Sequence, residues 1–193
     1  MASIKEIINR NILLSKTKFF YLNNYKDKSV KILDIGVQNN SIKQAKTFFV
    51  KSKYYGLDIE KFFSDRDMSL MEDFFQVDLE AGSLEFLDDD FDIVIINHVL
   101  EHVNNGINVV DTLAKKIKKG GSMYIEYPNI NSLSDTQSWR YHFHYDSTHK
   151  KIYFLEDIVN ILMKNGFNIL SSGKVDTKIK SIFLIPRIFM QLF

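Results

Sequence analysis

The chain has 193 residues, of which 25 are Lys or Arg and 24 are Asp or Glu, so its formal net charge is +1. This balance offers no positive field to nucleic acid, and we predict that the protein does not bind it. The absence of cysteine excludes disulfides, thiolate metal ligands and cysteine nucleophiles. The length and the 45% hydrophobic content predict one globular domain over residues 1–193.

No segment of the sequence predicts export or membrane insertion. Lys5, Glu6 and Arg10 place charges inside the apolar pattern of the N-terminal segment, which a secretory signal would keep uncharged. The most apolar uncharged stretches, residues 93–100 and 181–186, are far shorter than the roughly 20 residues of a transmembrane helix. With the lack of cysteine, these features lead us to expect a cytoplasmic protein without stable membrane insertion.

Strand-like apolar runs alternate with runs of helical period in the first half of the chain. Isoleucines at positions 4, 7, 8 and 12 predict a helix within residues 1–22. Short runs rich in β-branched and aromatic residues predict strands at 30–35, 54–58, 74–78 and 91–96. Ser41 is expected to cap a helix that covers residues 42–51.

The same alternation continues in the second half. The spacing of Val110, Leu113, Ala114 and Ile117 predicts a helix that ends at Lys118-Lys-Gly-Gly121, and Gly120 can adopt the left-handed conformation after it. A strand over 122–127 and a helix from Leu155 to at least Leu162 are expected next, followed by strands at 167–170 and 179–184. Three roles remain open for the apolar residues beyond 184, namely covering the core, forming a dimer and touching a membrane surface.

Alternating strands and helices predict a mostly parallel sheet that is covered on both faces. Ligands of such sheets bind at the carboxyl ends of the strands. Residues 30–130 should therefore form a ligand-binding core, with residues 131–153 as a loop over the site and residues 154–193 as a C-terminal helix and strands.

Acidic residues end three successive predicted strands. Asp34 precedes Gly36 in the first turn, and Asp58 follows 24 residues later, near the offset at which related folds place an acid on ribose hydroxyls. Asp78 ends the third strand, where a carboxylate can accept a hydrogen bond from an adenine amino group. Each acid alone also fits a solvated strand end. Gln38 and Ser41 replace glycines of the dinucleotide fingerprint, which disfavours a nicotinamide dehydrogenase or an epimerase on a related sheet.

The most specific segments are Phe91-Asp-Ile-Val-Ile-Ile-Asn-His-Val-Leu-Glu-His-Val103 and Lys118-Lys-Gly-Gly121. With Leu33-Asp-Ile-Gly36, Tyr55-Gly-Leu-Asp58 and Gly166-Phe167, they make residues 30 to 170 resemble class I S-adenosylmethionine-dependent methyltransferases. The resemblance implies a Rossmann-like α/β fold whose seven-stranded, mostly parallel sheet has the order 3-2-1-4-5-7-6 and an antiparallel last strand.

The resemblance also implies S-adenosylmethionine as cofactor and a set of residues that bind it. Asp34 and Gly36 would contact its methionine end, Asp58 its ribose and Asp78 its adenine, and Gln38 and Asn97 join the predicted cofactor site. Gln38 and Asn40 stand where the family has its second and third glycines. This departure motivates an alternative, a scaffold protein that keeps the fold without turnover.

A second group of residues is similar to a bacterial subgroup of these enzymes that is often associated with surface-polysaccharide biosynthesis. The residues are Asn105-Gly106, Tyr124-Ile-Glu-Tyr-Pro128, Phe143-His-Tyr-Asp-Ser-Thr-His149, Ile152-Tyr153 and Leu184-Ile-Pro186. The likeness implies O-methylation of a small polar acceptor such as a sugar or sugar nucleotide. Methylation of another small metabolite is the alternative, and a homodimer is a further expectation.

Histidines supply the predicted catalytic groups. In the loop from Trp139 to Tyr153, His149 is the expected general base and Asp146 the group that orients it. His144 and His98 are the reserve candidates, and a loop packed by its own aromatic rings is the alternative interpretation. His98 and His102 also suggest a metal site, but E-H-V recurs in metal-free relatives, so no metal is predicted and His102 is assigned a structural role.

Overall fold

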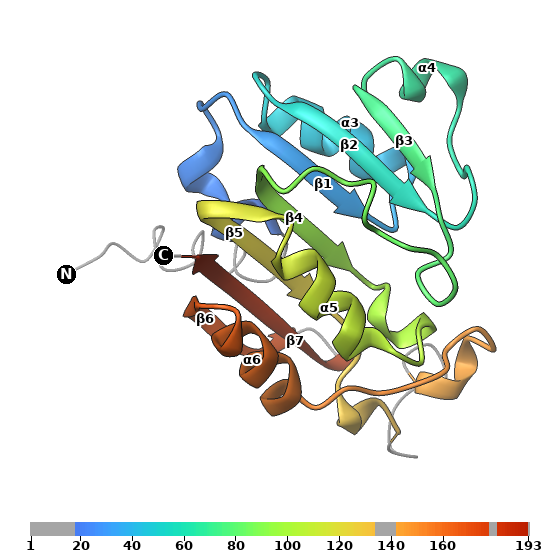
Figure 1. Cartoon of the computed structure of the whole chain (residues 1–193). Helices are drawn as coiled ribbons and strands as arrows, with labels where there is room; N and C mark the ends of the chain where they lie inside the picture. Colours follow the sequence, from blue (N-terminus) through green and yellow to red (C-terminus); the bar gives the residue numbers. More distant parts are fainter. Residues whose placement is uncertain (1–17, 134–141, 178–180, 193) are drawn as a thin grey trace, which may run out of the picture.

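The computed structural model describes residues 18–133, 142–177 and 181–192 (Figure 1). Its centre is one sheet with the strand order β3-β2-β1-β4-β5-β7-β6. The strands are β1 (Lys31–Ile35), β2 (Lys53–Asp58), β3 (Asp73–Gln76), β4 (Phe91–Asn97), β5 (Ile117–Glu126), β6 (Phe167–Thr177) and β7 (Ser181–Leu192). Strands β1 to β5 pair in parallel, and β7 runs antiparallel to both β5 and β6. The predicted fold is confirmed.

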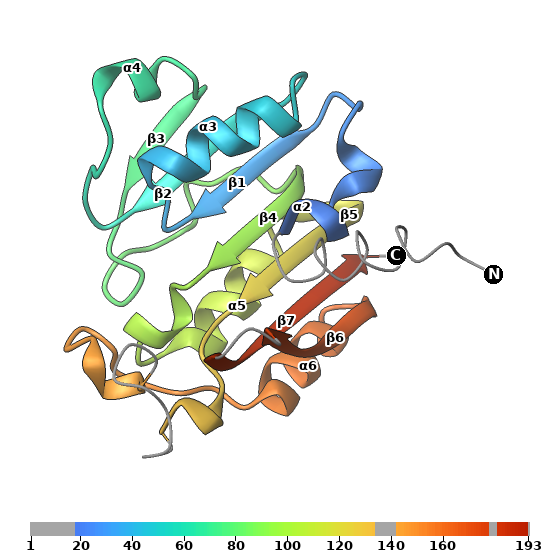
Figure 2. The ribbon, with the colours of Figure 1, turned by 180° about the vertical axis from the view of Figure 1, so that it is seen from behind.

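Helices cover both faces of this sheet (Figures 1 and 2). One face carries α2 (Lys18–Tyr21) and α3 (Asn39–Phe48), and the other carries α5 (Gly106–Ala114) and α6 (Leu155–Lys164). Helix α4 (Asp65–Met68) lies in the connection from β2 to β3. Short 3-10 turns complete the described elements: η1 (Asn23–Tyr25), η2 (Leu100–His102), η3 (Ile130–Leu133) and η5 (Phe143–Tyr145).

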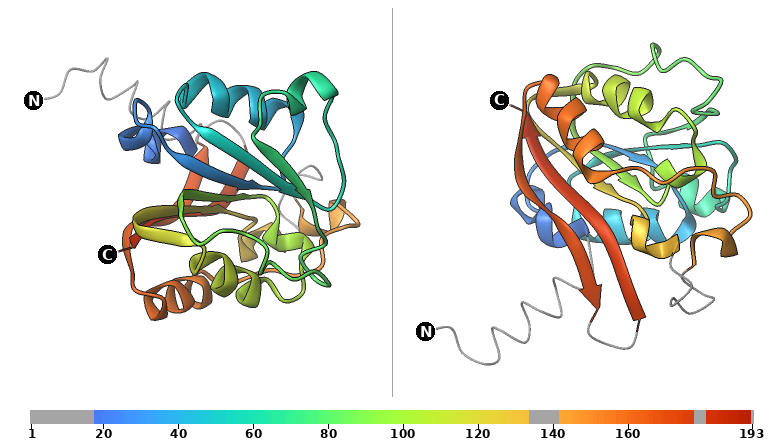
Figure 3. Two further views of the ribbon diagram at one scale, coloured as in Figure 1. Left: turned by 45° about the horizontal axis from the view of Figure 1, so that its top comes forward. Right: turned by 90° about the horizontal axis from the view of Figure 1, so that it is seen from below.

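The pleat of the strands divides the apolar side chains into two cores, and Figure 3 shows the sheet between its two helix layers. In β1, Ile32 packs with the α3 side, whereas Leu33 and Ile35 pack with the α5 and α6 side. This follows from the two-residue period of a strand, which sends successive side chains to opposite faces. Both cores are needed, because a parallel sheet buries both of its faces.

Several predicted boundaries differ from the observed ones, and among them the third strand ends at Gln76 and not at Asp78. Three differences reassign residues to another element or role, and the first is the start of the helix after β1. Helix α3 begins at Asn39, with Gln38 as its N-cap, so Ser41 is the third helical residue and not the cap. The backbone N–H of Gln38 donates to Ser41 Oγ at 2.9 Å, and that hydroxyl donates to the Gln38 carbonyl at 2.8 Å. A serine at the third helical position can therefore stabilise a helix start that lies before it.

The second correction concerns Ile117, which belongs to β5 and not to the preceding helix. Helix α5 ends at Ala114, and Ile117 pairs with Phe91 of β4 before the register shifts. Ile117 is buried in the same core as Val110 and Leu113, so its apolar side chain fits either interpretation of the pattern. Gly120 has the predicted left-handed conformation, φ +78°, within the strand.

The third correction concerns the C-terminal residues. Strand β6 continues to Thr177 and β7 to Leu192, beyond the predicted ends at 170 and 184. The apolar tail is therefore a strand that hydrogen-bonds to β5 on one side and β6 on the other. Of the predicted N-terminal helix, residues 1–17 lie outside the described residues, and Lys18–Tyr21 is helical. No helix in the described ranges is long and apolar enough to cross a membrane.

Candidate active site

A pocket of about 690 Å³ lies at the carboxyl ends of the parallel strands, where this architecture binds its ligands. Residues that follow β1, β2, β3 and β4 line it, together with part of the loop after β5. Among the predicted site residues, its wall includes Gly36, Gln38, Asp58, Asp78, Asn97, His98 and Asp146. Asp34, His144 and His149 do not line it.

Gly36 forms the turn between β1 and α3 at the pocket wall. Its φ of +77° is favourable for glycine alone, and a Cβ there would lie 2.4 Å from Val99 Cγ2, which follows the neighbouring strand β4. The Gly36 N–H donates to the Leu57 carbonyl at 2.8 Å. The turn is thus held close to both adjacent strands, which leaves its backbone at the pocket surface.

Replacing Gly36 with alanine is expected to destabilise the protein and to weaken ligand binding at the pocket. The strained φ alone costs about 1–3 kcal/mol, and the contact with Val99 adds to it. Gly120→Ala is the matched control, because Gly120 has the same sign of φ but no atom within 4 Å of its Cβ position. Urea unfolding of both variants measures the difference, and equal losses of stability would contradict the steric argument.

Asp34 lies beneath the pocket and not on its wall. It is 1% exposed, and its Oδ2 accepts hydrogen bonds from Lys18 Nζ at 3.1 Å and from the Tyr54 hydroxyl at 2.5 Å. Burial and the Asp34 charge raise the pKa of Tyr54 well above its usual value. Asp34 therefore joins α2, β1 and β2 directly below the Gly36 turn, and its predicted contact with the cofactor's methionine end remains a prediction.

The other two acids face the pocket at neighbouring strand ends. Asp58 is the last residue of β2, and its Oδ1 accepts the Ile59 N–H at 2.7 Å. Burial raises the pKa of Asp58, against backbone hydrogen bonds that lower it. Asp78 lies two residues beyond β3, and its Oδ1 accepts the Glu80 N–H at 2.8 Å. Both carboxylates are on the pocket wall, and their contacts with a ribose and an adenine remain predictions.

Gln38 and Asn40 occupy the positions where the motif has glycines. Gln38 has φ −129° and ψ 164°, an extended conformation that any residue adopts, so the backbone requires no glycine there. Both residues line the pocket. The departure from the glycine pattern therefore adds polar side chains at the start of α3 without straining the chain.

His98 stands at the end of β4 between two glutamates. It has φ +56°, its Nδ1 lies 3.2 Å from Glu101 Oε1, and its Nε2 lies 3.6 Å from Glu126 Oε1. Burial by itself lowers the pKa of His98, but the hydrogen bonds and charges of the two glutamates outweigh it and raise the pKa to about 9. At neutral pH His98 is therefore a cation whose two ring nitrogens face Glu101 and Glu126 at this side of the pocket.

The loop after β5 reaches the pocket through Asp146, Thr148 and Lys150. The backbone N–H groups of Lys150 and Lys151 donate to the Glu101 carbonyl, at 2.7 and 3.2 Å. These bonds place the described part of the predicted acceptor loop against the residues that follow β4. Trp139 and Tyr141, which we expect to offer ring faces to an acceptor, lie outside the described residues.

Tyr153, in the Ile152-Tyr153 motif at the end of this loop, attaches the loop to Val103 and to the start of α5. Its hydroxyl donates to the Val103 carbonyl and accepts the Gly106 N–H at 2.8 Å. A Cβ on Gly106 would lie 2.7 Å from Tyr153 Cζ, so the glycine lets the ring approach the start of α5. Tyr153 is buried, so its place in the motif reflects attachment of the loop and not contact with a ligand.

The predicted pair of His149 and Asp146 is not hydrogen-bonded. His149 Nε2 and Asp146 Oδ2 are 3.9 Å apart, and His149 Nδ1 contacts the Phe143 carbonyl at 2.7 Å. Asp146 Oδ1 instead accepts from the Thr148 N–H at 2.9 Å and its hydroxyl at 2.5 Å. Asp146 thus positions Thr148. His144 is exposed.

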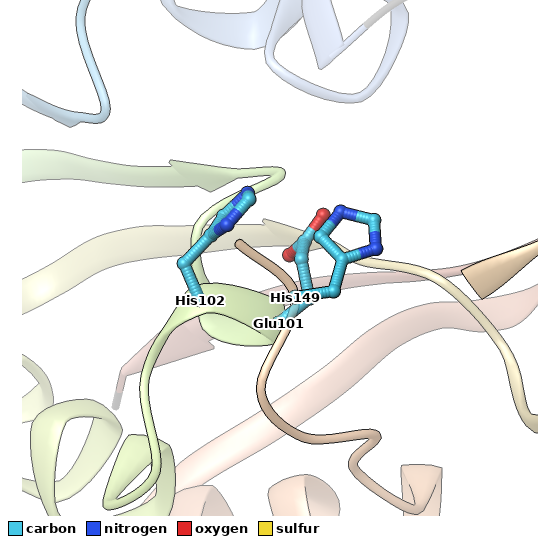
Figure 4. Close-up of side chains that lie close together, drawn as sticks. All are labelled: Glu101, His102 and His149. Atoms are coloured by element: carbon cyan, nitrogen blue, oxygen red, sulfur yellow. The ribbon is translucent and has the colours of Figure 1, made fainter. Parts of the chain in front are cut away.

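The structure also brings Glu101, His102 and His149 together, which the sequence analysis did not anticipate (Figure 4). Glu101 and His102 lie in η2, whereas His149 comes from the loop that follows β5. A sequence signal existed in the adjacent Glu101 and His102, but the contribution of His149 depends on how the loop returns to η2.

The strand order and the strand-end acids on the pocket wall are those that the resemblance to S-adenosylmethionine-dependent methyltransferases implies. The sequence matches the family model described as "Methyltransferase domain" over residues 9–172, so the chain belongs to that family. It is a methyltransferase whose methyl donor is S-adenosylmethionine, as predicted. No curated protein matches the chain significantly.

Solved structures agree with this fold. A methyltransferase from Archaeoglobus fulgidus has a TM-score of 0.62 and 19% identity, over 94% of each chain. One from Mesorhizobium loti has a TM-score of 0.68 and 14% identity, over 92% of this chain and 99% of that one. The 1,6-didemethyltoxoflavin-N1-methyltransferase of Burkholderia thailandensis, solved with that compound and S-adenosylhomocysteine bound, has a TM-score of 0.60 and 11% identity, over 94% and 77% of the two chains.

Proposed function

We propose that this methyltransferase O-methylates a small hydroxylated acceptor, a sugar or sugar nucleotide, in the biosynthesis of a bacterial surface glycan. The observation that carries the proposal is the continuity of the pocket. It extends from Asp58 and Asp78, which suit the ribose and adenine of the cofactor, to Asp146, Thr148 and Lys150 of the loop. One pocket therefore offers a place for the donor and, beside it, a polar place for an acceptor.

The residues on the wall fit S-adenosylmethionine. The pocket volume lies within the roughly 300–1,000 Å³ of small-molecule sites. Gly36 leaves the first turn open, and Asp58 and Asp78 present carboxylate oxygens for hydroxyl and amino donors. When bound, the cofactor supplies an electrophilic methyl group on a sulfonium.

Methyl transfer to a hydroxyl requires the protein to position the acceptor and to remove its proton. The acceptor oxygen forms a bond to the methyl carbon while the carbon–sulfur bond breaks and its electron pair returns to sulfur. A sugar hydroxyl is a poor nucleophile at neutral pH, so a proton acceptor near the oxygen accelerates the reaction.

Among the predicted catalytic histidines, His149 has the geometry that favours proton removal. His98 is already protonated at neutral pH because its pKa is about 9. His149 donates through Nδ1 to a carbonyl, which leaves the lone pair of Nε2 available. We therefore propose that His149, with its neighbours Glu101 and His102, activates the acceptor hydroxyl.

Methylation of another small metabolite is the second candidate. The Burkholderia thailandensis neighbour was solved with a small heterocyclic acceptor, 1,6-didemethyltoxoflavin, on the same fold. The two candidates differ in the acceptor atom, which is a hydroxyl oxygen in a sugar and a ring nitrogen in such a heterocycle. We favour the hydroxyl because the loop of this chain offers polar groups to the pocket.

A screen with methyl-labelled S-adenosylmethionine tests the proposal. We expect label to be transferred to a sugar nucleotide or sugar, and not to RNA or DNA oligonucleotides, because a net charge of +1 releases few counterions on binding. The products are identified by mass spectrometry, with heat-denatured protein as the blank. Label on a ring nitrogen of a small metabolite would favour the second candidate, and label on nucleic acid would contradict both.

A further inference from the structure

Glu101, His102 and His149 form a compact cluster beside the pocket. One nitrogen or oxygen ligand atom from each residue lies within 4.8 Å of the others. Figure 4 shows the two imidazoles and the Glu101 carboxylate close together, and the two rings are 4.8 Å apart between centroids. His102 also lines the pocket, so the cluster adjoins the place proposed for the acceptor.

The hydrogen bonds around the two imidazoles determine which nitrogen of each carries a lone pair. His149 Nδ1 faces the Phe143 carbonyl at 2.7 Å, and a carbonyl only accepts, so Nδ1 carries the proton. His102 Nδ1 lies 2.9 Å from Thr148 Oγ1, whose own hydrogen is donated to Asp146. Thr148 therefore accepts from His102 Nδ1–H. In the neutral form of each ring, the lone pair therefore lies on Nε2.

Glu101 supplies a buried carboxylate with one unused oxygen. The residue is 2% exposed, and its Oε1 is held by His98 Nδ1 at 3.2 Å. Its Oε2 has no hydrogen-bond partner among the described residues. A buried carboxylate oxygen without a partner is costly, so it calls for a proton donor or a cation at this position.

We propose that Glu101, His102 and His149 bind a divalent first-row transition-metal ion such as Zn²⁺. Two neutral imidazoles and one carboxylate are a ligand set typical of such ions, whereas Mg²⁺ and Ca²⁺ prefer oxygen ligands throughout. The partners around the ligands are those of known metal sites, since each histidine donates its second N–H to an oxygen. Three protein ligands leave a coordination position for a further ligand.

The metal ion would take part in the proposed methylation by acting on the acceptor hydroxyl, and this catalytic role rests on the proposed function. A hydroxyl bound to a divalent cation loses its proton to water at a lower pH than a free hydroxyl does. Because His102 lines the pocket, an ion on this cluster lies where an acceptor hydroxyl can reach it. With the ion bound, His149 would act on the acceptor as a metal ligand, and without it His149 is the proton acceptor proposed above.

Metal binding can be measured without any acceptor. Protein purified without a histidine tag and stripped with a chelator is titrated with Zn²⁺ by calorimetry and with Co²⁺ by visible absorption. We expect one ion per chain and the d–d spectrum of a low-coordinate Co²⁺ site. Glu101→Gln and His149→Gln should each abolish tight binding, and His144→Gln, an exposed histidine of the same loop, should leave the affinity unchanged.

Thr148→Val is a sharper variant, because it keeps the side-chain volume and removes the hydroxyl that accepts from His102 Nδ1–H. The same change removes the bond from that hydroxyl to Asp146, whose Oδ1 keeps the Thr148 N–H as a donor. We expect it to weaken Zn²⁺ binding roughly 10–100-fold, the usual effect of losing an outer partner. Affinity for S-adenosylhomocysteine in each variant verifies that the fold is retained.

Two results would overturn the proposal: no binding at millimolar Zn²⁺, or binding that Glu101→Gln and His149→Gln leave unchanged while His144→Gln removes it. Failure of the proposed function is a separate outcome. Bound Zn²⁺ without methylation of any hydroxylated acceptor would contradict the function and support the metal site. Undiminished methylation of a sugar by chelator-stripped protein would support the function and contradict the catalytic role of the metal.

Discussion

Replacing His149 with alanine is expected to lower the rate of methyl transfer roughly 10²–10⁴-fold, the usual worth of a positioned proton acceptor. The reason is that His149 belongs to the cluster with Glu101 and His102 and has its Nδ1 bound to a carbonyl. Its Nε2 is therefore the nitrogen that can take up a proton, and alanine removes it. Affinity for S-adenosylmethionine should remain nearly unchanged, because His149 does not line the pocket.

The measurement pairs turnover with calorimetric affinity for S-adenosylhomocysteine. His149 packs against the Phe143 ring at a centroid distance of 4.7 Å, so the alanine variant also removes packing. His149→Gln is therefore measured beside it, since glutamine keeps an N–H donor and more of the volume. Full activity in both variants would dismiss His149. A loss in His144→Ala as large as that in His149→Ala would transfer the role to the reserve candidate.

Replacing Asp58 with alanine is expected to weaken binding of S-adenosylmethionine roughly 10–150-fold, which corresponds to about 1.5–3 kcal/mol for a hydrogen bond to a charged group. The reason is that Asp58 ends β2 with its carboxylate on the pocket wall, where it can accept from both ribose hydroxyls.

Calorimetry with S-adenosylhomocysteine measures this effect, with Asp73→Ala as the control. Asp73 is an exposed acid at the opposite end of the neighbouring strand β3, outside the pocket wall. We expect Asp73→Ala to bind like the unaltered protein and NAD not to bind any of the three. Unchanged affinity in Asp58→Ala would contradict the assignment of the ribose contact.

The order of elements could be predicted because each strand carries a local signal. Residues 91–96 are a continuous apolar run between polar residues, and the structure has β4 at Phe91–Asn97. Leu155, Ile158 and Leu162 share one helical face, and α6 covers Leu155–Lys164. Boundaries were missed where one side chain serves two patterns. Ile117 fits the apolar face of α5 by spacing, but its pairing with Phe91 makes it a strand residue.

The pocket wall was predictable for a geometric reason, since the carboxyl ends of parallel strands meet at one edge. Asp58 and Asn97 end their strands and Asp78 follows its strand, and the structure places all three on the wall. Asp34 also ends a strand motif, yet its side chain points to the α3 side and is enclosed by Lys18 and Tyr54. Strand position alone could not distinguish these cases, because the face of the sheet depends on the pleat and on which helix covers it.

The sequence by itself determined the fold, the family and the edge of the sheet where the pocket lies, because these depend on local periodicity and on motifs at strand ends. Only the tertiary structure decided that His149 lies with Glu101 and His102 and that Asp146 accepts hydrogen bonds from Thr148. His149 lies 47 residues after His102, and the hydrogen bonds from Lys150 and Lys151 to the Glu101 carbonyl bring it to the cluster. Asp146 has both Thr148 and His149 nearby in one short loop, and it bonds to Thr148. A contact between segments so far apart has no period in the sequence, so its chemistry became visible only when the loop was seen against η2.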